Sequence, residues 1–465
     1  MGPSQSSHPT KAWSNEDAER HLRSLELFGM RFGLDRMRRM MTALGSPERR
    51  FATIHVVGTN GKSSTTRMIA AILERHGLRT GTYTSPHLIS YTERVQIGER
   101  DLDSDAFAAA IARAARAAEH VNHTLAGDDH VTQFELLTAA ALWAMAEQGV
   151  EVAVVEAGLG GRYDATGVID SRVTVLTNVG LEHTRWLGPT VVDIAEEKLA
   201  VLRPGTTLVL ADVLAEGPLA VAERVAAEQD ARILRACAEP AEAAAPAETA
   251  APAETIALLA KGSFQRRNFA LARAAAAAYL RSVGIEPRSD AVRDAAAATE
   301  IPGRLQVVGE KPLTVLDGAH NPDAVRALVE SLPELLGARP VGLVLGVLED
   351  KDAAGMLSVL LGVCERAWFT APPSSRALSP AALQSLARQL GFDAVDCEPE
   401  PWQALVQARR WAQQRGDDAA VLATGSVYLV GDLLDHLAPA DERVSAVEPP
   451  TPTPSTHSSS RRSVR

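Results

Sequence analysis

The segment that most constrains the fold is residues 51–76, FATIHVVGTNGKSSTTRMIAAILERH. Residues 54–57 are rich in β-branched side chains, as is typical of a buried strand. The glycine-rich loop GTNGKSS follows at residues 58–64, and apolar residues then recur at helical spacing. A strand, a glycine loop with a lysine and a helix, in that order, form a phosphate cradle. The glycines let backbone N–H groups face inward, and the helix N-terminus adds positive potential. The segment therefore predicts a nucleotide-binding α/β fold.

The spacing inside this loop differs from that of the common P-loop. Gly58 and Gly61 are separated by two residues, whereas four residues usually stand between the first glycine and the Gly-Lys pair. Lys62 is placed to reach terminal phosphates, and a hydroxyl of Ser63 or Ser64 would lie near a bound Mg²⁺. The alternative is a glycine-rich turn that caps an ordinary helix. The strand that precedes the loop favours a nucleotide site.

The composition narrows the classes of protein. A chain of 465 residues with 46% hydrophobic content has room for two or three domains. Its 47 basic and 58 acidic residues give a net charge of −11, which argues against nucleic acid or an anionic membrane as partner. Three scattered cysteines suit a reducing compartment and no metal cluster. No signal peptide or long apolar run is evident, so we expect a cytoplasmic protein with no membrane span.

Strand-like and helical segments alternate along most of the chain, which predicts parallel, doubly wound sheets with helices on both faces. We expect a nucleotide-binding domain over 15–300 that begins with one amphipathic helix over 15–44. A smaller Rossmann-like α/β domain should cover 301–440. The Ala/Pro/Glu-rich tract 239–255 reads as a disordered insertion. Residues 1–14 and the Pro/Ser/Thr-rich stretch 441–465 read as disordered ends.

Three polar residues fall at or just past predicted strand ends: Ser85, Glu156 and His183. Ligands of open α/β sheets bind at the carboxyl ends of the strands. A hydroxyl, a carboxylate and an imidazole beside a phosphate cradle would suit Mg²⁺, with the histidine as the less usual ligand. Taken singly, a serine before proline is more often a turn residue, and a strand-end glutamate is more often solvated or capping. Together with Lys62 they predict a metal site.

Three further loops have the same position after a strand. GLGGRYDAT at residues 158–166 follows Glu156 directly and combines glycines with Arg162 and Asp164. DGAHNP at 317–322 and TGS at 424–426 follow strands of the second domain. The loop at 158–166 could be merely flexible, but glycines beside Arg162 and Asp164 at a strand end suit close approach to a ligand. The other two loops repeat this pattern of small and polar residues after a strand.

Seven motifs in this order resemble those of one known family: HVVGTNGKSS, YTSPHL, VVEAGLGGRYDAT, TNVGLEHTRWLG, IAEEK, IPGR and DGAHNP. The chain resembles the folylpolyglutamate synthase/dihydrofolate synthase group of the Mur ligase superfamily over residues 24–437. The resemblance implies a P-loop-type central domain and an ATP-dependent amide ligase. In such a ligase a carboxylate, from folate or dihydropteroate, takes the γ-phosphoryl group of ATP, and L-glutamate then displaces phosphate from the acyl phosphate.

The resemblance also implies roles for individual residues. The phosphates would be held by Gly58, Thr59, Asn60, Gly61, Lys62, Ser63 and Ser64. Mg²⁺ would be bound by Ser85, Glu156 and His183. Lys198 matches a lysine that is carbamylated in this family. The nucleotide would further meet Gln265, Asn268, Arg304 and Asp317, and the other substrates would meet Arg162, Asp164, His320 and Ser426. The catalytic groups would thus be Lys62, Lys198, His183 and Arg304, in a protein we expect to be a monomer.

The sequence departs from the family pattern at four places. Ser63, Glu182 and Gly167 replace the more usual Gly, Asp and Asn, and Leu199 interrupts the usual Glu-Lys-Ala-Gly. These changes leave open a paralogue that acts on another carboxylate. A cell-wall or cyanophycin-type ligase is a further alternative, although such a protein should carry an additional N-terminal domain before the cradle. A non-catalytic nucleotide-binding protein is the alternative from a different class.

Overall fold

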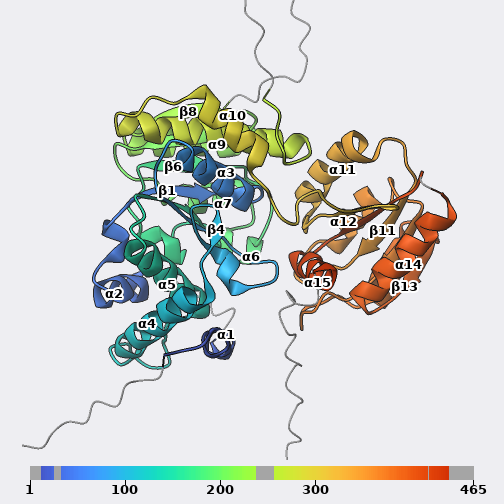
Figure 1. Cartoon of the computed structure of the whole chain (residues 1–465), viewed down its shortest axis with the longest axis horizontal. Helices are drawn as coiled ribbons and strands as arrows, with labels where there is room; N and C mark the ends of the chain where they lie inside the picture. The colour runs from blue at the N-terminus through green and yellow to red at the C-terminus, as the bar shows by residue number, and fades with distance from the viewer. Residues whose placement is uncertain (1–11, 26–32, 237–255, 417, 439–465) are drawn as a thin grey trace, which may run out of the picture.

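A computed structural model describes residues 12–25, 33–236, 256–416 and 418–438. The predicted disordered segments 239–255 and 441–465 lie outside the described residues, as does segment 1–14 except for residues 12–14, of which Ser14 caps the first helix. The predicted domain limits stay predictions, but the chain does form two separate sheets, each with its own helices (Figure 1). The predicted two-domain α/β fold is confirmed.

The first domain is a sheet of eight strands in the order β4-β3-β2-β5-β1-β6-β7-β8. All neighbours from β2 to β8 are parallel, and β3 and β4 form an antiparallel edge. Its elements are α1 (Asn15–Ser24), α2 (Asp35–Ala43), β1 (Ala52–Val57), α3 (Lys62–Glu74), β2 (Thr80–Tyr83), β3 (Val95–Ile97), β4 (Arg100–Asp101), α4 (Ser104–Asn122), α5 (Gln133–Glu147), β5 (Val152–Glu156), β6 (Val173–Leu176), α6 (Thr184–Leu187), α7 (Val191–Leu199), β7 (Thr207–Ala211), α8 (Glu216–Glu228), β8 (Arg232–Ala236), α9 (Ser263–Ser282) and α10 (Ser289–Ala298).

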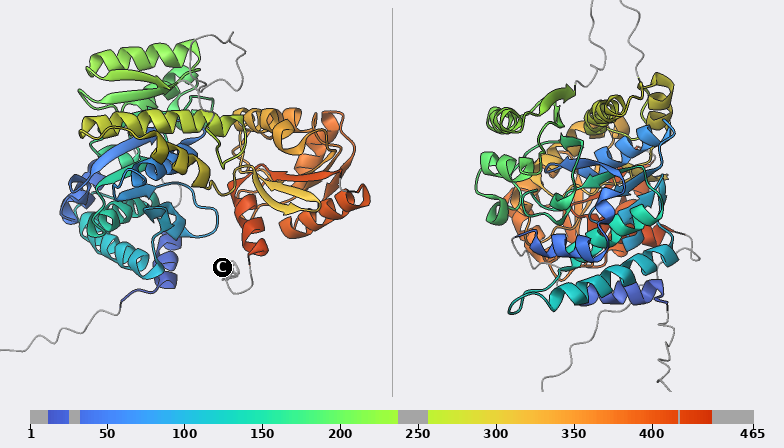
Figure 2. Two further views of the ribbon diagram at one scale, coloured as in Figure 1. Left: turned by 45° about the horizontal axis from the view of Figure 1, so that its top comes forward. Right: turned by 90° about the vertical axis from the view of Figure 1, so that its left-hand side faces the viewer.

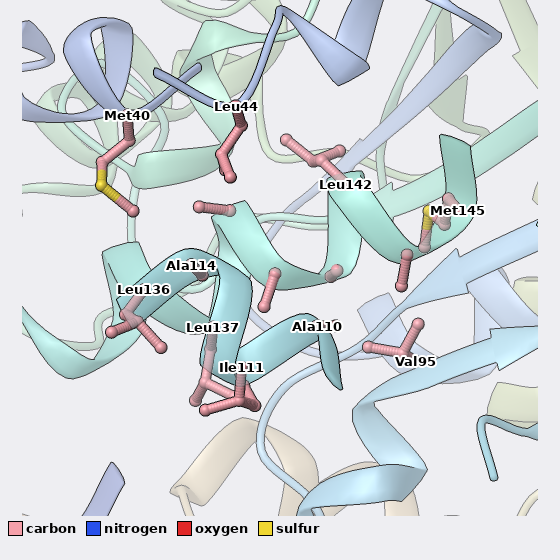
Figure 3. Packing of buried hydrophobic residues seen from close by; sticks show 14 of the residues in the cluster. Met40, Leu44, Val95, Ala110, Ile111, Ala114, Leu136, Leu137, Leu142 and Met145 are labelled. Atoms are coloured by element: carbon pink, nitrogen blue, oxygen red, sulfur yellow. The ribbon is translucent and has the colours of Figure 1, made fainter. Parts of the chain in front are cut away.

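Helices cover both faces of this sheet. On one face α3 packs along α9 and α10, with Met68, Ile69 and Ile72 buried against the strands. On the other face α4 and α5 pack with α2 over a second apolar cluster (Figure 3). Strand β1 lies between β5 and β6 and is buried from Thr53 onward. The loops that follow β1, β2, β5 and β6 therefore meet at one edge of the sheet.

The predicted single helix over residues 15–44 is wrong. Helix α1 ends at Ser24, because Leu25 is extended with φ −86° and ψ 152°. Helix α2 begins at Asp35, two residues after Gly33, whose φ of 117° cannot be part of a right-handed helix. The periodic apolar residues belong to two helices rather than to one.

The second domain has six strands in the order β13-β12-β11-β14-β10-β9. Its strands are parallel except β9, which pairs antiparallel with β10. Its elements are β9 (Gln306–Glu310), β10 (Leu313–Leu316), α11 (Pro322–Leu336), β11 (Val341–Leu345), α12 (Ala353–Leu360), β12 (Arg366–Phe369), α13 (Pro380–Gln389), β13 (Val395–Cys397), α14 (Pro401–Gln414), β14 (Ala420–Thr424) and α15 (Val427–Leu437). Helices α11 to α13 cover one face, and α14 and α15 cover the other.

The two domains lie side by side, with the N-terminal end of α9 beside α11 (Figure 2). The Ser263 and Ser331 hydroxyls are 3.1 Å apart across this contact. Leu88, from the loop after β2, packs into the apolar cluster under α15. Within the described residues no helix is long and apolar enough to cross a membrane.

Candidate active site

Both glycines of the phosphate loop are required by their surroundings. Gly58 has φ 148°, and a Cβ there would lie 1.9 Å from the Thr177 hydroxyl oxygen. Gly61 has φ 79°, and a Cβ there would lie 2.5 Å from the Asn268 side-chain oxygen. Any larger residue would be strained and would also push apart the chain segments that hold the loop. The loop is thus fixed by close packing, as a cradle for phosphate requires.

The loop that follows β6 holds the phosphate loop in place. The Asn60 N–H donates to the Asn178 side chain at 2.8 Å, and the Thr59 N–H donates to the Asn178 carbonyl at 3.1 Å. Thr177 donates its hydroxyl to the Asn60 carbonyl at 2.6 Å. Lys62, the first residue of α3, donates its ammonium to the Thr59 carbonyl at 3.1 Å. The lysine therefore lies over the loop, where a phosphate could replace the carbonyl as its partner.

The three predicted metal ligands lie at or after the ends of β2, β5 and β6 and line one cavity. Ser85 donates its N–H to the Glu156 carboxylate at 3.1 Å. Glu156 is the last residue of β5 and is 1% exposed. His183 stands in the left-handed region with φ 51° at the start of α6. Because their strands are close neighbours in the sheet, residues far apart in sequence meet at its carboxyl edge.

The chemistry of these side chains fits a divalent cation. Burial raises the pKa of Glu156, although Lys62 opposes the shift, so a cation beside the carboxylate would favour its charged form. Burial lowers the pKa of His183 to about 4, which leaves a neutral imidazole at neutral pH, the form that binds metals. The described residues contain no group of three or more His, Cys, Asp and Glu side chains that could hold a metal. A cation here would therefore rely on a hydroxyl and on water as well, as Mg²⁺ does.

Lys198, on α7, is buried beside the phosphate loop. Its ammonium is 2.7 Å from the Gly58 carbonyl, and the residue is 4% exposed. Burial, with the nearby charge of Lys62, lowers the pKa of Lys198 to about 7. A large fraction of this amine is therefore neutral at physiological pH, which makes it a nucleophile.

The second domain contributes the opposite wall of the cavity. Asp317, just after β10, accepts N–H groups from Leu305 at 2.9 Å and from Ala319 at 2.8 Å. A Cβ on Gly318 would lie 2.5 Å from a guanidinium nitrogen of Arg304, so the arginine side chain packs directly against this glycine. Burial raises the pKa of Asp317, and Arg304 opposes the shift.

A pair of asparagines joins the phosphate loop directly to the second domain. The Asn60 and Asn321 side chains exchange hydrogen bonds of 3.2 and 2.9 Å. Asn321 also caps α11 by accepting the Ala324 N–H at 2.8 Å. Nearby, a Cβ on Gly180 would lie 2.2 Å from a carboxylate oxygen of Asp323, so the two domains approach closely here.

Glu182 forms a second link between the domains. Its contacts with the second domain were not predicted from the sequence. It lies 2.9 Å from the Lys351 ammonium and 3.5 Å from the His320 ring, and both of these belong to the second domain. Burial raises the pKa of Glu182, but His320 and Lys351 lower it by more, so its pKa lies well below the usual range. Lys351 follows β11 in the run Glu349–Asp352, and this strand-end position was the signal available in the sequence.

Most of the predicted site residues line a single cavity of about 580 Å³ between the domains, a volume typical of ligand sites. They are Gly58, Thr59, Asn60, Gly61, Lys62, Ser63, Ser64, Ser85, Glu156, His183, Lys198, Asn268, Arg304, Asp317 and His320.

Four predicted residues do not line this cavity. Gln265 is fully buried on α9 and accepts a hydrogen bond from Asn268 at 2.9 Å, and its amide nitrogen has no partner among the described residues. Ser426 is buried and caps α15 by accepting the Tyr428 N–H. Both residues support groups at the cavity wall rather than facing the space.

Arg162 and Asp164 belong to the loop after β5. Arg162 is exposed and pairs with Glu197 at 2.7 Å. Asp164 is buried, and its carboxylate accepts the Leu159 N–H at 2.7 Å. Asp164 therefore fixes the shape of this loop, of which Gly158, Leu159 and Gly160 reach the cavity.

Gly167, one of the departures from the family pattern, also lies away from the cavity. A Cβ there would meet the Gly161 carbonyl at 3.2 Å and the Leu34 side chain at 3.3 Å. The change at this position therefore alters packing against α2 and removes no group from the cavity.

Two Mur ligase domains match the chain, one within each of its two sheet-forming parts. The Mur ligase middle domain matches residues 56–210. The Mur ligase glutamate ligase domain matches residues 303–427.

Two curated proteins are similar over most of their length. Folylpolyglutamate synthase of Lacticaseibacillus casei is 32% identical over 405 residues, which are 84% of this chain and 92% of that protein. Dihydrofolate synthase/folylpolyglutamate synthase of Escherichia coli (strain K12) is 32% identical over 437 residues, 93% of this chain and 96% of that protein.

Solved structures show the same likeness. Mycobacterium tuberculosis folylpolyglutamate synthase complexed with ADP superimposes with a TM-score of 0.82 at 30% identity, covering 91% of this chain and 98% of that one. E. coli FolC in complex with DHPP and ADP gives 0.78 at 30% identity, covering 92% and 99%. The bifunctional enzyme of Yersinia pestis c092, complexed with AMPPNP and Mn ion, gives 0.75 at 30% identity over the same shares of both chains.

Proposed function

This chain belongs to the Mur ligase family, in its folylpolyglutamate synthase and dihydrofolate synthase group, and we propose that it is an ATP-dependent ligase that joins L-glutamate to a folate-type carboxylate. The observation that carries the proposal is the cavity between the domains. It brings together the phosphate loop, the predicted metal ligands Ser85, Glu156 and His183, and the polar strand ends of the second domain. A ligase that activates an acid with ATP needs these groups in one space.

ATP would bind with its phosphates on the loop from Gly58 to Ser64. Lys62 would leave the Thr59 carbonyl to contact the terminal phosphates. The adenine would lie near Asn268, supported from behind by Gln265. Arg304 and Asp317 would complete the nucleotide site from the side of the second domain. The ADP, AMPPCP and AMPPNP complexes of similar proteins support this assignment.

Ser85, Glu156 and His183 would hold a divalent cation, Mg²⁺ in the cell, and the manganese complex of the Yersinia protein supports a metal here. Bound there, the cation would neutralise charge on the terminal phosphates. The chain positions it through the Ser85–Glu156 hydrogen bond, and burial keeps His183 neutral.

The reaction has two steps. A carboxylate oxygen of the acceptor attacks the γ-phosphorus as the bond to the bridging oxygen of ADP breaks, which gives an acyl phosphate. The amine of L-glutamate then attacks the acyl carbon, a proton is lost, and inorganic phosphate leaves. Lys62 and Arg304 stabilise the charge on the transferring group. Contact between the domains keeps water away from the acyl phosphate, which water would hydrolyse.

Lys198 would act as a carbamate. Its neutral amine would attack CO₂ and lose a proton, and the resulting anion would lie between the phosphate loop and the metal-binding set. The supporting observations are its burial beside Gly58 and its pKa of about 7.

The acceptor and the amino acid would be bound by different domains. Arg162 and the loop that Asp164 shapes would contact the acceptor. The E. coli FolC complex with DHPP and ADP supports a folate-related acceptor. His320 and Ser426 lie on the glutamate side. All of these groups come from one chain, which suits a monomer.

The test is ATP- and Mg²⁺-dependent incorporation of labelled L-glutamate, with dihydropteroate and tetrahydrofolate compared as acceptors. Lys62→Ala should lower incorporation at least about 10³-fold, because the developing charge on the phosphates loses a preorganised cation. Lys261→Ala, an exposed lysine just before α9, is the matched control and should retain normal turnover.

Two outcomes would contradict the proposal. Near-normal turnover of the Lys62→Ala variant would remove the phosphate loop from the reaction. ADP binding without glutamate incorporation into either acceptor would favour a non-catalytic nucleotide-binding protein, and incorporation into another carboxylic acid would favour a paralogous ligase.

A further inference from the structure

Arg67 lies close to the active site and has no hydrogen bond or ion pair with any residue that the structure describes. It stands on α3 one turn after Ser63, so both side chains project from the same face of the helix. Both line a small second cavity of about 50 Å³. A half-buried guanidinium with no carboxylate partner is uncommon, because its five N–H donors lose water without replacement.

The second cavity is rich in donors. Arg304 lines it from the segment that joins the domains. His87 also lines it, and its Nδ1 accepts from the Arg94 side chain at 3.0 Å, so the proton of the neutral ring is on Nε2.

Glu93 is the acidic residue that lines the second cavity, and its carboxylate already accepts backbone hydrogen bonds. Glu93 accepts N–H groups from Leu88, Ile89 and Ser90 at 2.6–2.8 Å. It therefore fixes the loop after β2 and makes no ion pair with Arg67. Arg304 faces the carboxylates of Asp317 and Glu156, so Arg67 is the cation of this cavity that has no acidic partner among the described residues. Its free N–H donors suit an anion.

The position of the cavity restricts the anion. It shares Ser63, Pro86, Arg304 and Val427 with the main cavity, so its occupant would lie next to the reacting groups. A volume of 50 Å³ is roughly four times what one water needs, enough for a carboxylate but not for a nucleotide. Val427 belongs to the second domain, so the cavity is complete only when the domains are in contact.

We propose that Arg67 binds the α-carboxylate of the terminal glutamyl unit of a folate acceptor. The inference rests on the proposed function. A folyl acceptor has two carboxylates at this end, of which the γ-carboxylate reacts at the phosphates and the α-carboxylate lies a few bonds away. Dihydropteroate carries its single carboxylate on an aromatic ring and has no such group. Arg67 is thus a specificity-determining residue that favours acceptors already carrying glutamate.

The test compares binding of two ligands that differ only in the glutamyl unit, tetrahydrofolate and tetrahydropteroate, by calorimetry in the presence of Mg²⁺ and AMPPNP. We expect Arg67→Gln to lower the preference for tetrahydrofolate by at least about tenfold, as expected for loss of a charged hydrogen bond. Arg67→Lys should restore part of the preference. If Arg67→Gln folds poorly, Arg67→Met, which keeps the apolar stem, takes its place in the test. It should show the same loss of preference for tetrahydrofolate. Arg113→Gln, on the exposed face of α4, is the matched control.

An unchanged preference in the Arg67→Gln and Arg67→Met variants would overturn the proposal. A raised KM for L-glutamate with an unchanged preference would also overturn it, because the cavity would then hold the carboxylate of the incoming amino acid. Failure of the proposed function looks different: the wild-type protein would bind neither pterin ligand.

Discussion

At the scale of single residues, Lys198 shows how surroundings create reactivity. Its pKa is lowered to about 7, first by burial and then by Lys62. Below pH 7 the ammonium dominates and cannot attack CO₂, and above pH 7 the neutral amine dominates. If the carbamate is needed, activity at fixed dissolved CO₂ should rise about tenfold between pH 6 and pH 8, following the neutral fraction.

The measurement is a pH–rate profile combined with carbon-13 NMR after incubation with labelled bicarbonate. A carbamate resonance should be present in the wild-type protein and absent from Lys198→Gln, which should also lose activity at every pH. Full activity in CO₂-free buffer at pH 8, with no such resonance, would show that the lysine acts unmodified.

Residues at strand ends were the ones that the sequence could predict. Ser85, Glu156 and His183 line one cavity as expected, because parallel strands deliver their carboxyl ends to one edge. The pair of Glu182 and Lys351 could not be predicted, because the two residues are 169 positions apart and meet only when two separately folded domains pack. The buried positions of Gln265 and Ser426 likewise depend on how α9 and α15 lie in the fold.

At the scale of elements, α15 packs closely against the loop after β2, and a glycine in the helix makes this contact possible. Gly431 lies within this helix, and a Cβ there would be 2.0 Å from the Leu88 carbonyl oxygen. Alanine normally stabilises a helix interior by about 1 kcal/mol relative to glycine. Here we expect Gly431→Ala to lower the melting temperature and to weaken ADP–Mg²⁺ binding, because the loop that it displaces also carries Ser85.

Gly217→Ala on α8 is the matched control, since its Cβ would meet only the exposed Val192 side chain, at 3.0 Å. Thermal unfolding and calorimetry with ADP measure both effects. A higher melting temperature with unchanged ADP affinity for Gly431→Ala would contradict this prediction. It would show that the loop after β2 can move away from residue 431 without changing the nucleotide site.

Buried strands and their helices could be predicted from apolar runs, whereas the antiparallel edge strands could not. Strands β3 and β4 have three and two residues, too few for a clear alternation, and β9 has five residues but none of them is fully buried. The break between α1 and α2 was missed because apolar residues keep helical spacing on both sides of it.

At the scale of the whole molecule, a few polar contacts hold the domains together around the cavity. Asn60–Asn321 and Glu182–Lys351 both cross from one domain to the other. The side chains of Glu182 and Lys351 are only 12% and 11% exposed. Loss of Glu182 would leave the buried Lys351 ammonium with only its longer contact to Asp350, at 3.6 Å. A buried charge that has lost its close partner is costly in a closed molecule, and opening relieves this cost.

We therefore expect Glu182→Gln to shift the protein toward an open form, seen as a larger radius of gyration in small-angle X-ray scattering without nucleotide. The double variant Glu182→Gln/Lys351→Met, which buries no unpaired charge, should be more compact than Glu182→Gln alone. Identical scattering from the wild-type protein and both variants would mean that other contacts determine the domain arrangement.

The central claim is that a metal-bound nucleotide occupies the cavity between the domains, with its phosphates on the loop after β1. A crystal structure with ADP and Mn²⁺ tests this most directly, because manganese is located by its anomalous scattering. The account predicts the diphosphate along Gly58–Ser64 and a manganese peak among Ser85, Glu156 and His183. Nucleotide density at any other place, or manganese away from these three side chains, would contradict it.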